Sequence, residues 1–487
     1  MIDTREREMT FRDKKVIVVG LARSGIGAAN LLSRLGARVT VTDSKPREKL
    51  ESGIQRLSLD IEIAVGSNPG ELFDAADVIV ISPGVPGDSP FLTRARVRGI
   101  PVISELELAY QIMTSKEDGA IAVSSTINKY QAPLFIGITG TNGKSTTTTL
   151  VGLMLKEFGY KTLLGGNIGN ALTEEVHTAL GGSRDLQVDH IVAEISSFQL
   201  EEIQEFRPHI AAILNISPDH LDRYKSMEDY ITAKARIFEK QQKGDYLILN
   251  ADDPAVMNLF RTRLEPMGSM MPDVFFFSRK KKVRGIYLKR GALTLSKNGS
   301  GEKLIQSNEI RIPGLHNLEN AMAASLMALL AGCSVEAVKK VLRSFGGLEH
   351  RMEFAGEVEG VRFINDSKGT NTGAVAKSLE DFEDIILIMG GTDKGSDFIH
   401  LKKLIMKKVK LLVLIGEAQE KIGMALGSST ETICCNSLED AVEQSLANAQ
   451  SGDVVLLSPG CASFDMFHDF EERGRRFKEA VRRLSEQ

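Results

Sequence analysis

The segment LFIGITGTNGKST at residues 134–146 limits the possible folds of this chain more than any other feature. A short apolar strand runs into a glycine-containing loop, and a helix-forming stretch begins at Lys144. Successive backbone N–H groups in such a loop, together with the N-terminus of the following helix, attract phosphate groups. The sequence therefore predicts a parallel α/β sheet with a phosphate-binding loop at the end of one strand.

In the predicted phosphate loop, the Lys144 ammonium would reach the terminal phosphates, and the Ser145 hydroxyl is suited to bind magnesium. The spacing departs from the strict G-x-x-x-x-G-K-[ST] motif, because Ile138 stands in the place of the first glycine and Gly140 supplies the flexibility instead. The candidate phosphate-binding residues are Gly140, Thr141, Asn142, Gly143, Lys144, Ser145 and Thr146.

Strand and helix patterns alternate along most of the chain, from KVIVVG at Lys15 to DVVLLSPG near the C-terminus. This alternation predicts an α/β protein with three consecutive α/β domains. We expect an N-terminal Rossmann-like domain, a linker with an insertion, a central P-loop ATPase-type domain whose mostly parallel sheet has a small added β-sheet, and a C-terminal Rossmann-like domain. Their expected bounds are 1–114, 115–132, 133–312 and 313–487.

Composition excludes several classes of protein. The 60 Lys and Arg against 64 Asp and Glu leave a net charge of −4, so no overall field attracts nucleic acid or an anionic membrane. The four cysteines show no C-x-x-C spacing and indicate neither a zinc site nor a disulfide framework. The N-terminal segment is charged where a signal peptide is apolar, and no apolar run is long enough to span a membrane. We expect a cytoplasmic protein with neither nucleic acid nor a membrane as partner.

The first predicted strand ends in GLARSGIG, at residues 20–27, which is an imperfect dinucleotide fingerprint. Ala22 occupies the second glycine position, where a methyl group hinders the close approach of a pyrophosphate. Asp43, at the end of the next strand, stands where a ribose-binding carboxylate belongs. The motif favours a nucleotide other than NAD, although NAD and a purely structural turn remain alternatives. The segment Ser82–Pro86 ends another strand and is either part of the same crevice or a tight turn.

Polar residues also follow strands of the central domain. Glu194 ends the strand in HIVAEIS, and Asp219 and His220 follow the strand in HIAAILNIS. The carboxyl ends of parallel strands converge on the ligand crevice of an open α/β sheet. Magnesium bound mainly to phosphates takes one or two protein ligands, and we expect Glu194 and His220 to serve as such ligands.

Lys234 is anomalous in its predicted helix. The apolar positions Met227, Tyr230, Ile231 and Ile237 mark one face, and Lys234 occupies the i+7 position of the same face. One interpretation is that its stem covers apolar surface while the ammonium reaches solvent. The other is that burial lowers its pKa, so that a neutral amine reacts with carbon dioxide to form a carbamate ligand for magnesium.

The last domain places polar loops after three strands. These loops are 365–371, 390–395 and 458–465, and their lysines and hydroxyls suit an acidic small substrate. Arg351 precedes the domain and could reach the nucleotide from the domain junction. Cys461 lies beside a glycine, but no His or Asp pattern supports a role as nucleophile.

Nine motifs follow one another along the chain: GTNGKST, AEISSFQLE, LNISPDHLDRY, the lysine of ITAKARIFE, GLHNLENAMAA, EHRMEF, NDSKGTN, GGTDKG and SPGCASFDMF. In this order they resemble the Mur ligases of peptidoglycan synthesis, and the similarity extends over the chain from about Lys15. Three of the motifs, SSFQLE, NDSKGTN and SPGCASFDMF, are most similar to the members that add D-glutamate to UDP-N-acetylmuramoyl-L-alanine. The D-N-P-R-type motif of the diaminopimelate-adding members is not present.

The resemblance implies one domain each for the UDP-sugar, ATP and the amino acid. It implies that Ser24, Asp43, Ser82, Gly84 and Asn167 bind the UDP-sugar. ATP would be held by the phosphate loop with Asn320 and Arg351. Two magnesium ions would be held by Ser145, Glu194, His220 and Lys234 as carbamate, and D-glutamate by Thr370, Lys394, Ser463 and Phe470. The implied catalytic residues are Lys144, Glu194, His220 and Lys234.

The resemblance also implies an ATP-dependent ligase that acts as a monomer through an acyl phosphate. Its expected partners are UDP-N-acetylmuramoyl-L-alanine, D-glutamate and ATP. A folylpolyglutamate synthase should lack the first nucleotide-type domain, and an NAD-dependent dehydrogenase would leave GTNGKST unexplained. A non-catalytic nucleotide-binding scaffold is a further alternative. The joint presence of Glu194, His220 and Lys234 argues against it.

Overall fold

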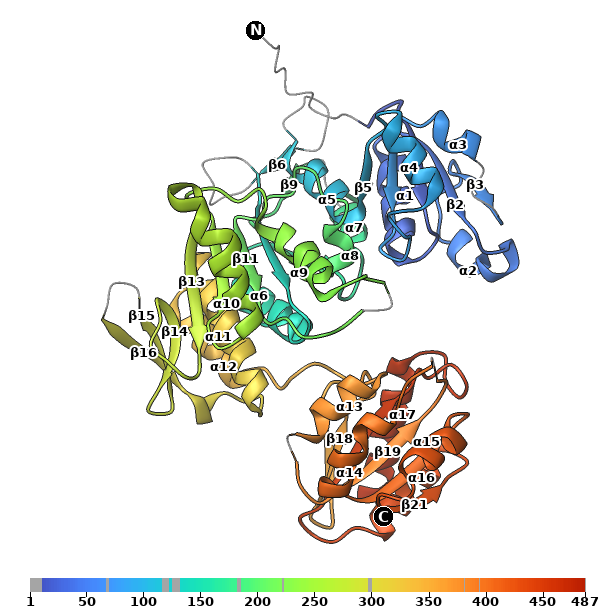
Figure 1. The fold of residues 1–487 in the computed structure, drawn as a ribbon, viewed down its shortest axis with the longest axis vertical. Coiled ribbons are helices and arrows are strands. Elements are labelled where there is room, and N and C mark those ends of the chain that lie inside the picture. The colour runs from blue at the N-terminus through green and yellow to red at the C-terminus, as the bar shows by residue number, and fades with distance from the viewer. Residues whose placement is uncertain are drawn as a thin grey trace. The chain divides into compact units, whose positions relative to one another are not determined.

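The structure is a computed structural model that describes residues 11–66, 70–115, 122–124, 132–181, 185–220, 223–296, 300–380, 382–393 and 395–486. It divides into two compact units, Met1–Phe345 and Gly346–Gln487 (Figure 1). The first unit contains two large sheets and the second unit contains one. The predicted class of three α/β domains is therefore confirmed, whereas most of the predicted insertion at 115–132 lies outside the described residues.

The first sheet is Rossmann-like, as predicted. Its five strands pair in parallel in the order β3-β2-β1-β4-β5. Strands β1 and β4 are neighbours, so the turn after β1 and the segment after β4 lie at the same edge. The elements are β1 (Lys15–Val19), β2 (Arg38–Asp43), β3 (Glu62–Val65), β4 (Val78–Ile81), β5 (Val102–Ser104), α1 (Arg23–Arg34), α2 (Glu51–Ile54), α3 (Gly70–Asp74), α4 (Pro90–Val97) and α5 (Glu105–Thr114).

The second sheet has nine strands in the order β16-β15-β14-β13-β12-β11-β7-β10-β8. The strand before the phosphate loop, β7, lies between β10 and β11 and is parallel to both. Strands β14 to β16 pair in antiparallel fashion, and the added strands predicted from the sequence thus extend the main sheet. The strands are β7 (Leu134–Thr139), β8 (Thr162–Gly166), β10 (His190–Glu194), β11 (Ile210–Ile213), β12 (Tyr246–Asn250), β13 (Asp273–Ser278), β14 (Gly285–Lys289), β15 (Ala292–Ser296) and β16 (Gly301–Gln306), while β6 (Ala122–Ser124) pairs with β9 (Asp185–Gln187).

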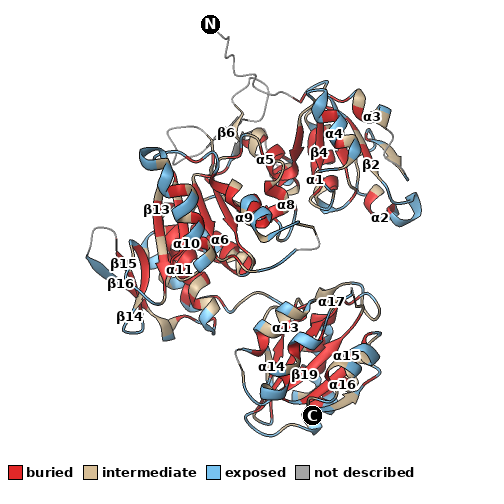
Figure 2. Ribbon diagram, in the orientation of Figure 1, coloured by how far each residue is buried: buried red, intermediate tan, exposed pale blue. Residues whose placement is uncertain are grey.

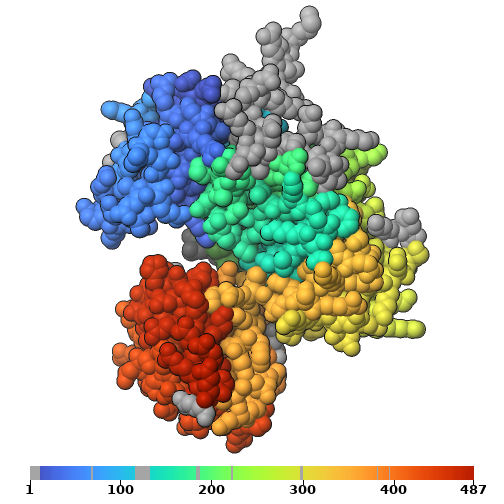
Figure 3. All heavy atoms as spheres, turned by 180° about the vertical axis from the view of Figure 1, so that it is seen from behind, coloured from blue at the N-terminus to red at the C-terminus, as the bar shows by residue number. Residues whose placement is uncertain are grey.

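Helices α11 and α12 pack against α6, the helix that follows the phosphate loop. Figure 3 shows their orange residues beside the teal residues of α6. The alanine-rich face of α11 is buried, and both helices belong to the first compact unit, which ends at Phe345. The helices of this part are α6 (Lys144–Phe158), α7 (Leu172–Gly181), α8 (Ser197–Leu200), α9 (Met227–Ala235), α10 (Pro254–Leu259), α11 (Leu315–Leu330) and α12 (Val335–Ser344).

The second unit has a six-stranded sheet in the order β17-β18-β22-β19-β20-β21. Only the pairing of β17 with β18 is antiparallel among these described strands. The central strands β22 and β19 are wholly buried, as the continuous apolar runs of parallel strands require. The elements are β17 (Glu353–Val358), β18 (Val361–Asn365), β19 (Ile385–Gly390), β20 (Val409–Ile415), β21 (Glu431–Cys434), β22 (Val454–Gly460), α13 (Thr372–Leu379), α14 (Lys402–Lys408), α15 (Gln419–Leu426), α16 (Leu438–Ala447) and α17 (Phe470–Ser485).

Burial follows the layered pattern of α/β proteins. The strands of the three large sheets are mostly buried, whereas the outer faces of many helices are intermediate or exposed (Figure 2). Among the described helices, none is both long enough and apolar enough for a membrane crossing.

His190, at the start of β10, leads to a prediction about acid stability. Its ring is fully buried beside Tyr160, neither ring nitrogen has a hydrogen-bond partner among the described residues, and burial lowers its pKa to about 4. Between pH 6.5 and 4 the unfolded chain therefore binds a proton that the folded chain does not. We expect the free energy of unfolding to fall by about 3 kcal/mol over this range because of His190 alone.

Urea unfolding followed by circular dichroism between pH 4 and 7 measures this effect. The His190→Phe variant should lose less stability on acidification than the natural chain. His400→Gln, at an exposed position, is the control for loss of a histidine that is not buried. Equal slopes for the natural chain and His190→Phe would contradict the assignment.

Candidate active site

The phosphate loop connects β7 to α6 through a conformation that requires glycine. Gly143 precedes the helix with a positive φ of 83°. A Cβ atom at Gly143 would also lie 2.2 Å from Oδ1 of Asn320. The first N–H groups of α6 have no acceptor within the helix and are directed at the loop, which is the arrangement that binds anions.

The structure brings Asn320 of α11 beside the phosphate loop, although the two are far apart in the sequence. Its side chain is buried, and its Oδ1 accepts a hydrogen bond from the Thr147 hydroxyl at 3.4 Å. Its Nδ2 donates to Oδ1 of Asn317 at 3.3 Å. Packing of α11 on α6 thus places Asn320, a predicted ATP residue, next to the phosphate loop.

Asn215 supports the phosphate loop, a role that was not predicted from the sequence. Its carbonyl oxygen accepts from the Thr141 N–H at 3.0 Å, and its Oδ1 accepts from the Asn142 N–H at 2.8 Å. Its Nδ2 in turn donates to the Asn142 carbonyl oxygen at 3.0 Å. A signal was available, because Asn215 lies just after a strand in LNISPDHLDRY, yet only the pairing of β7 with β11 shows which loop it meets.

Glu194 lies at the carboxyl end of β10, between the ends of β7 and β8. Its side chain is buried, and Oε1 accepts from Nδ2 of Asn167 at 2.9 Å. Oε2 has no hydrogen-bond partner in the described part of the chain. A buried carboxylate oxygen without a partner is unfavourable by itself and suits a bound cation.

His220 lies in the loop after β11 and is partly exposed. Its ring centroid is 4.8 Å from that of Phe198, and its Nε2 is 3.6 Å from Oδ2 of Asp219. No group of three or more His, Cys, Asp or Glu side chains that could hold a metal occurs within the described residues. A magnesium ion here would therefore take most of its ligands from phosphate oxygens and water.

Lys234 is buried on α9, and the alternative in which its ammonium reaches solvent does not hold. Its side chain is only 2% exposed, and Nζ donates to the Gly140 carbonyl oxygen at 3.0 Å. Lys144 donates to the same oxygen at 2.9 Å. Burial and, to a smaller extent, the charge of Lys144 lower the pKa of Lys234 well below its usual value. Two lysine amines therefore converge on one atom of the phosphate loop.

The residues expected to bind a UDP-sugar line the edge of the first sheet and the end of β8. Both carboxylate oxygens of Asp43 accept from backbone N–H groups, those of Leu21 and Lys45, each at 2.9 Å. Asp43 thus shapes the turn after β1. The Ser82 hydroxyl donates to the Gly20 carbonyl oxygen at 3.1 Å. Of the other expected residues, Ser24 is half-buried in the first turn of α1, and Gly84 and Asn167 are exposed in loops.

In the second unit, Arg473 of α17 joins the predicted polar loops. It is fully buried, and it donates to the Ser367 hydroxyl at 3.0 Å and to the carbonyl oxygens of Ser367, Cys461 and Ala462 at 2.8 to 3.3 Å. Burial lowers its pKa to about 10. The role of Arg473 was not predicted, although a signal was available: with Phe470, Phe477 and Val481 it falls on the apolar face of the helix.

The other sequence-predicted residues of the second unit lie near these loops. The Phe470 carbonyl oxygen accepts from the Ser367 hydroxyl at 2.8 Å, and the backbone of Ala462, beside Ser463, bonds to Thr392 in both directions. Burial raises the pKa of the Cys461 thiol to about 12, which agrees with its exclusion as a nucleophile. Thr370 and Arg351 also belong to this unit, and Lys394 lies outside the described residues.

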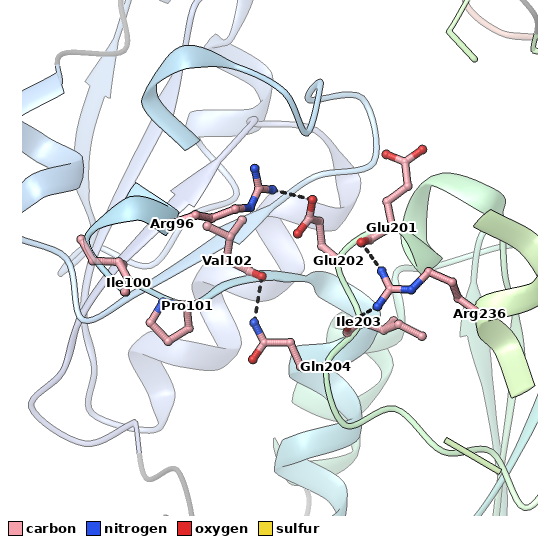
Figure 4. A pocket seen from close by; sticks show the side chains of 10 residues that line it. Arg96, Ile100, Pro101, Val102, Glu201, Glu202, Ile203, Gln204 and Arg236 are labelled. Carbon is pink, nitrogen blue, oxygen red and sulfur yellow. Dashed lines mark hydrogen bonds and ion pairs between the residues drawn. The ribbon is translucent and has the colours of Figure 1, made fainter. Parts of the chain in front are cut away.

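A pocket of about 460 Å³ lies where the segment 99–102 meets the segment 201–204 (Figure 4). Arg96 pairs with Glu202 at 2.5 Å, and Arg236 donates to the backbone carbonyl oxygens of Glu201 and Ile203. None of the sequence-predicted site residues lines this pocket. It is therefore separate from the candidate phosphate site.

Comparison with known proteins identifies the family. Residues 14–104 match the Mur ligase MurD-like N-terminal domain, residues 138–328 the Mur ligase middle domain, and residues 350–461 the Mur ligase glutamate ligase domain. Two curated relatives are the UDP-N-acetylmuramoylalanine–D-glutamate ligases of Geobacter metallireducens and Trichlorobacter lovleyi. They are 44% and 45% identical over 478 residues, which is 98% of this chain and 99% and 100% of theirs.

Similarity to solved structures supports the fold. A pseudomurein peptide ligase type C from Methanothermus fervidus aligns with a TM-score of 0.55 and 17% identity, over 97% of this chain and 100% of that one. The domain models, the near full-length relatives and the three sheets agree with one another. This chain therefore belongs to the Mur ligase family.

Proposed function

We propose that this chain is an ATP-dependent ligase that adds D-glutamate to UDP-N-acetylmuramoyl-L-alanine in peptidoglycan precursor synthesis. Its relatives, about 44% identical over nearly the whole chain, carry that activity in their names. The observation in the structure that carries the proposal is the convergence of Lys144 and Lys234 on the Gly140 carbonyl oxygen. The Lys144 ammonium in a phosphate loop suits a reaction that brings anions together, and the buried Lys234 amine on the same oxygen is placed to form the proposed carbamate beside it.

We assign the sugar nucleotide to the first domain, ATP to the central domain and D-glutamate to the last, and we propose that the enzyme acts as a cytoplasmic monomer. The proposed sugar-nucleotide residues are Ser24, Asp43, Ser82, Gly84 and Asn167. Those for ATP are Gly140 to Thr146 with Asn320 and Arg351. Those for D-glutamate are Thr370, Lys394, Ser463 and Phe470.

The residues around the loop fit magnesium. The unpartnered, buried Oε2 of Glu194 and the Ser145 hydroxyl are the oxygen ligands that magnesium prefers, and His220 and a Lys234 carbamate would complete the protein's share. Bound magnesium would neutralise phosphate charge while it shifts between oxygens. The buried amine of Lys234 supports the carbamate, because a neutral amine can add carbon dioxide, whereas an ammonium beside a divalent cation would be repelled.

In the proposed reaction, ATP transfers its γ-phosphoryl group to the alanyl carboxylate, which releases ADP and forms an acyl phosphate. The amine of D-glutamate attacks the acyl carbon. The tetrahedral intermediate then expels phosphate and leaves an amide, with loss of one amine proton. Lys144 stabilises negative charge on the transferring phosphoryl group, and the loop N–H groups hold the phosphates in place.

Phosphate release tests the proposed function. The purified chain with ATP, magnesium and UDP-N-acetylmuramoyl-L-alanine should release phosphate rapidly when D-glutamate is added. L-glutamate, L-alanine and meso-diaminopimelate, each supplied in turn, should leave the rate near background. Preference for any of these three over D-glutamate would contradict the assignment.

A further inference from the structure

Arg223 joins the segment after β4 to the central domain of the first unit. One guanidinium nitrogen donates to the Pro83 carbonyl oxygen at 2.7 Å, and the other donates to the Val85 carbonyl oxygen at 3.3 Å and to Oε2 of Glu201 at 2.8 Å. The planar fork of arginine allows these contacts at the same time, which a lysine ammonium does not. Through Arg223, the segment Ser82–Pro86 is thus attached to the central domain.

The same guanidinium lies over an aromatic ring that supports His220. Its central carbon is 4.1 Å from the ring centroid of Phe198, and the ring of Phe198 is 4.8 Å from that of His220. Such a cation–π contact favours one position of the ring. A shift of the Ser82–Pro86 segment would therefore act on the side chain against which His220 packs.

A second set of contacts continues to the phosphate loop. Tyr224 donates to Oε1 of Glu201 at 2.5 Å, and its ring centroid is 5.3 Å from that of Tyr230. The Tyr230 hydroxyl bonds the Thr141 hydroxyl at 3.2 Å. One carboxylate oxygen of Glu201 therefore accepts from Arg223. The other accepts from Tyr224, whose ring lies beside Tyr230, the residue that contacts the phosphate loop.

We propose that Arg223 is a positioning residue that couples the Ser82–Pro86 segment to the phosphate loop, so that the sugar nucleotide and ATP strengthen each other's binding. This inference rests on the proposed function, which assigns one substrate to each place. A ligand bound at the Ser82–Pro86 segment or at the phosphate loop fixes side chains that contact both sites. The second ligand then no longer has to order these side chains. By linkage, each substrate must change the affinity of the other by the same factor.

Titration calorimetry measures this factor directly. The Kd of UDP-N-acetylmuramoyl-L-alanine is determined with and without magnesium and the β,γ-methylene analogue of ATP. For the natural chain we expect the nucleotide to lower this Kd by about 10-fold, within the usual range of coupling. In Arg223→Met the ratio should fall to within about twofold of 1, and Arg223→Lys should be intermediate.

Arg96→Met is the matched control. Arg96 also forms an ion pair between the two domains, with Glu202 at 2.5 Å, but it contacts neither Phe198 nor the 83–85 carbonyl oxygens. If Arg223 only stabilised the fold, as Arg96 is expected to do, each substitution would lower the melting temperature. The ratio of the two Kd values would then stay the same in both variants. The proposal expects the ratio to be lost in Arg223→Met and kept in Arg96→Met.

Three results would overturn the coupling: a ratio of 1 in the natural chain, an unchanged ratio in Arg223→Met, or an equal loss in both variants. These are distinguishable from failure of the proposed function. Absence of UDP-N-acetylmuramoyl-L-alanine binding to the natural chain would overturn both proposals. If any of the three results occurs while the natural chain shows normal D-glutamate-dependent turnover, the coupling is wrong and the proposed function stands.

Discussion

Replacement of Lys144 by alanine should reduce ATP turnover by at least about 100-fold, the cost of removing one group that stabilises developing charge. In the structure, Nζ of Lys144 donates to the carbonyl oxygens of Gly140 and Thr141 at 2.9 and 2.8 Å, inside the loop that we propose binds the phosphates. Alanine keeps high helix propensity, so the start of α6 should persist. Phosphate release with all three substrates measures the loss.

The binding of the UDP-sugar should persist in Lys144→Ala, because its proposed residues lie mainly on the first sheet. Lys156→Ala is the matched control, since Lys156 is an exposed lysine on the same helix. It should retain normal turnover. Full turnover of Lys144→Ala would contradict the assignment of the phosphate loop.

Lys234→Ala should lose most activity while the fold persists. If Lys234 acts as a carbamate, the site needs a carboxylate-like anion near magnesium, and alanine leaves a space without that charge. Added formate or acetate should then enter the space and restore part of the rate, whereas an equal concentration of chloride should not. Removal of bicarbonate should lower the activity of the natural chain.

Lys240→Ala is the control for this experiment, because Lys240 is an exposed lysine shortly after α9. Its activity should be normal and insensitive to formate. Near-normal turnover of Lys234→Ala would exclude the carbamate. An unmodified ammonium on Lys234 in a high-resolution map of the active enzyme would exclude it equally.

Several features of the fold followed from local sequence patterns. The β-branched runs before GLARSGIG and GTNGKST predicted buried parallel strands, and both β1 and β7 are such strands. The helical period also placed Lys234 on a buried face, and its side chain is 2% exposed. These properties depend on residues close together in the chain, because the periods of strands and helices are local.

Other features depend on which distant segments pack together. The sequence pattern of α11 did not show that it packs on α6, and this tertiary contact brings Asn320 to the phosphate loop. Asn215 supports the loop only because β11 pairs with β7.

The same limit applies to side chains that join loops. Arg223 resembles many surface arginines in sequence, and Arg473 is marked only by its place on the apolar face of α17. The role of both comes from backbone carbonyl oxygens that the fold brings within reach. Sequence by itself determined the strand–loop–helix units and the chemical types at their ends, since these are set by local periodicity and residue chemistry. Tertiary structure decided which of those ends meet, because contacts between distant segments depend on strand order and helix packing, which no local pattern encodes.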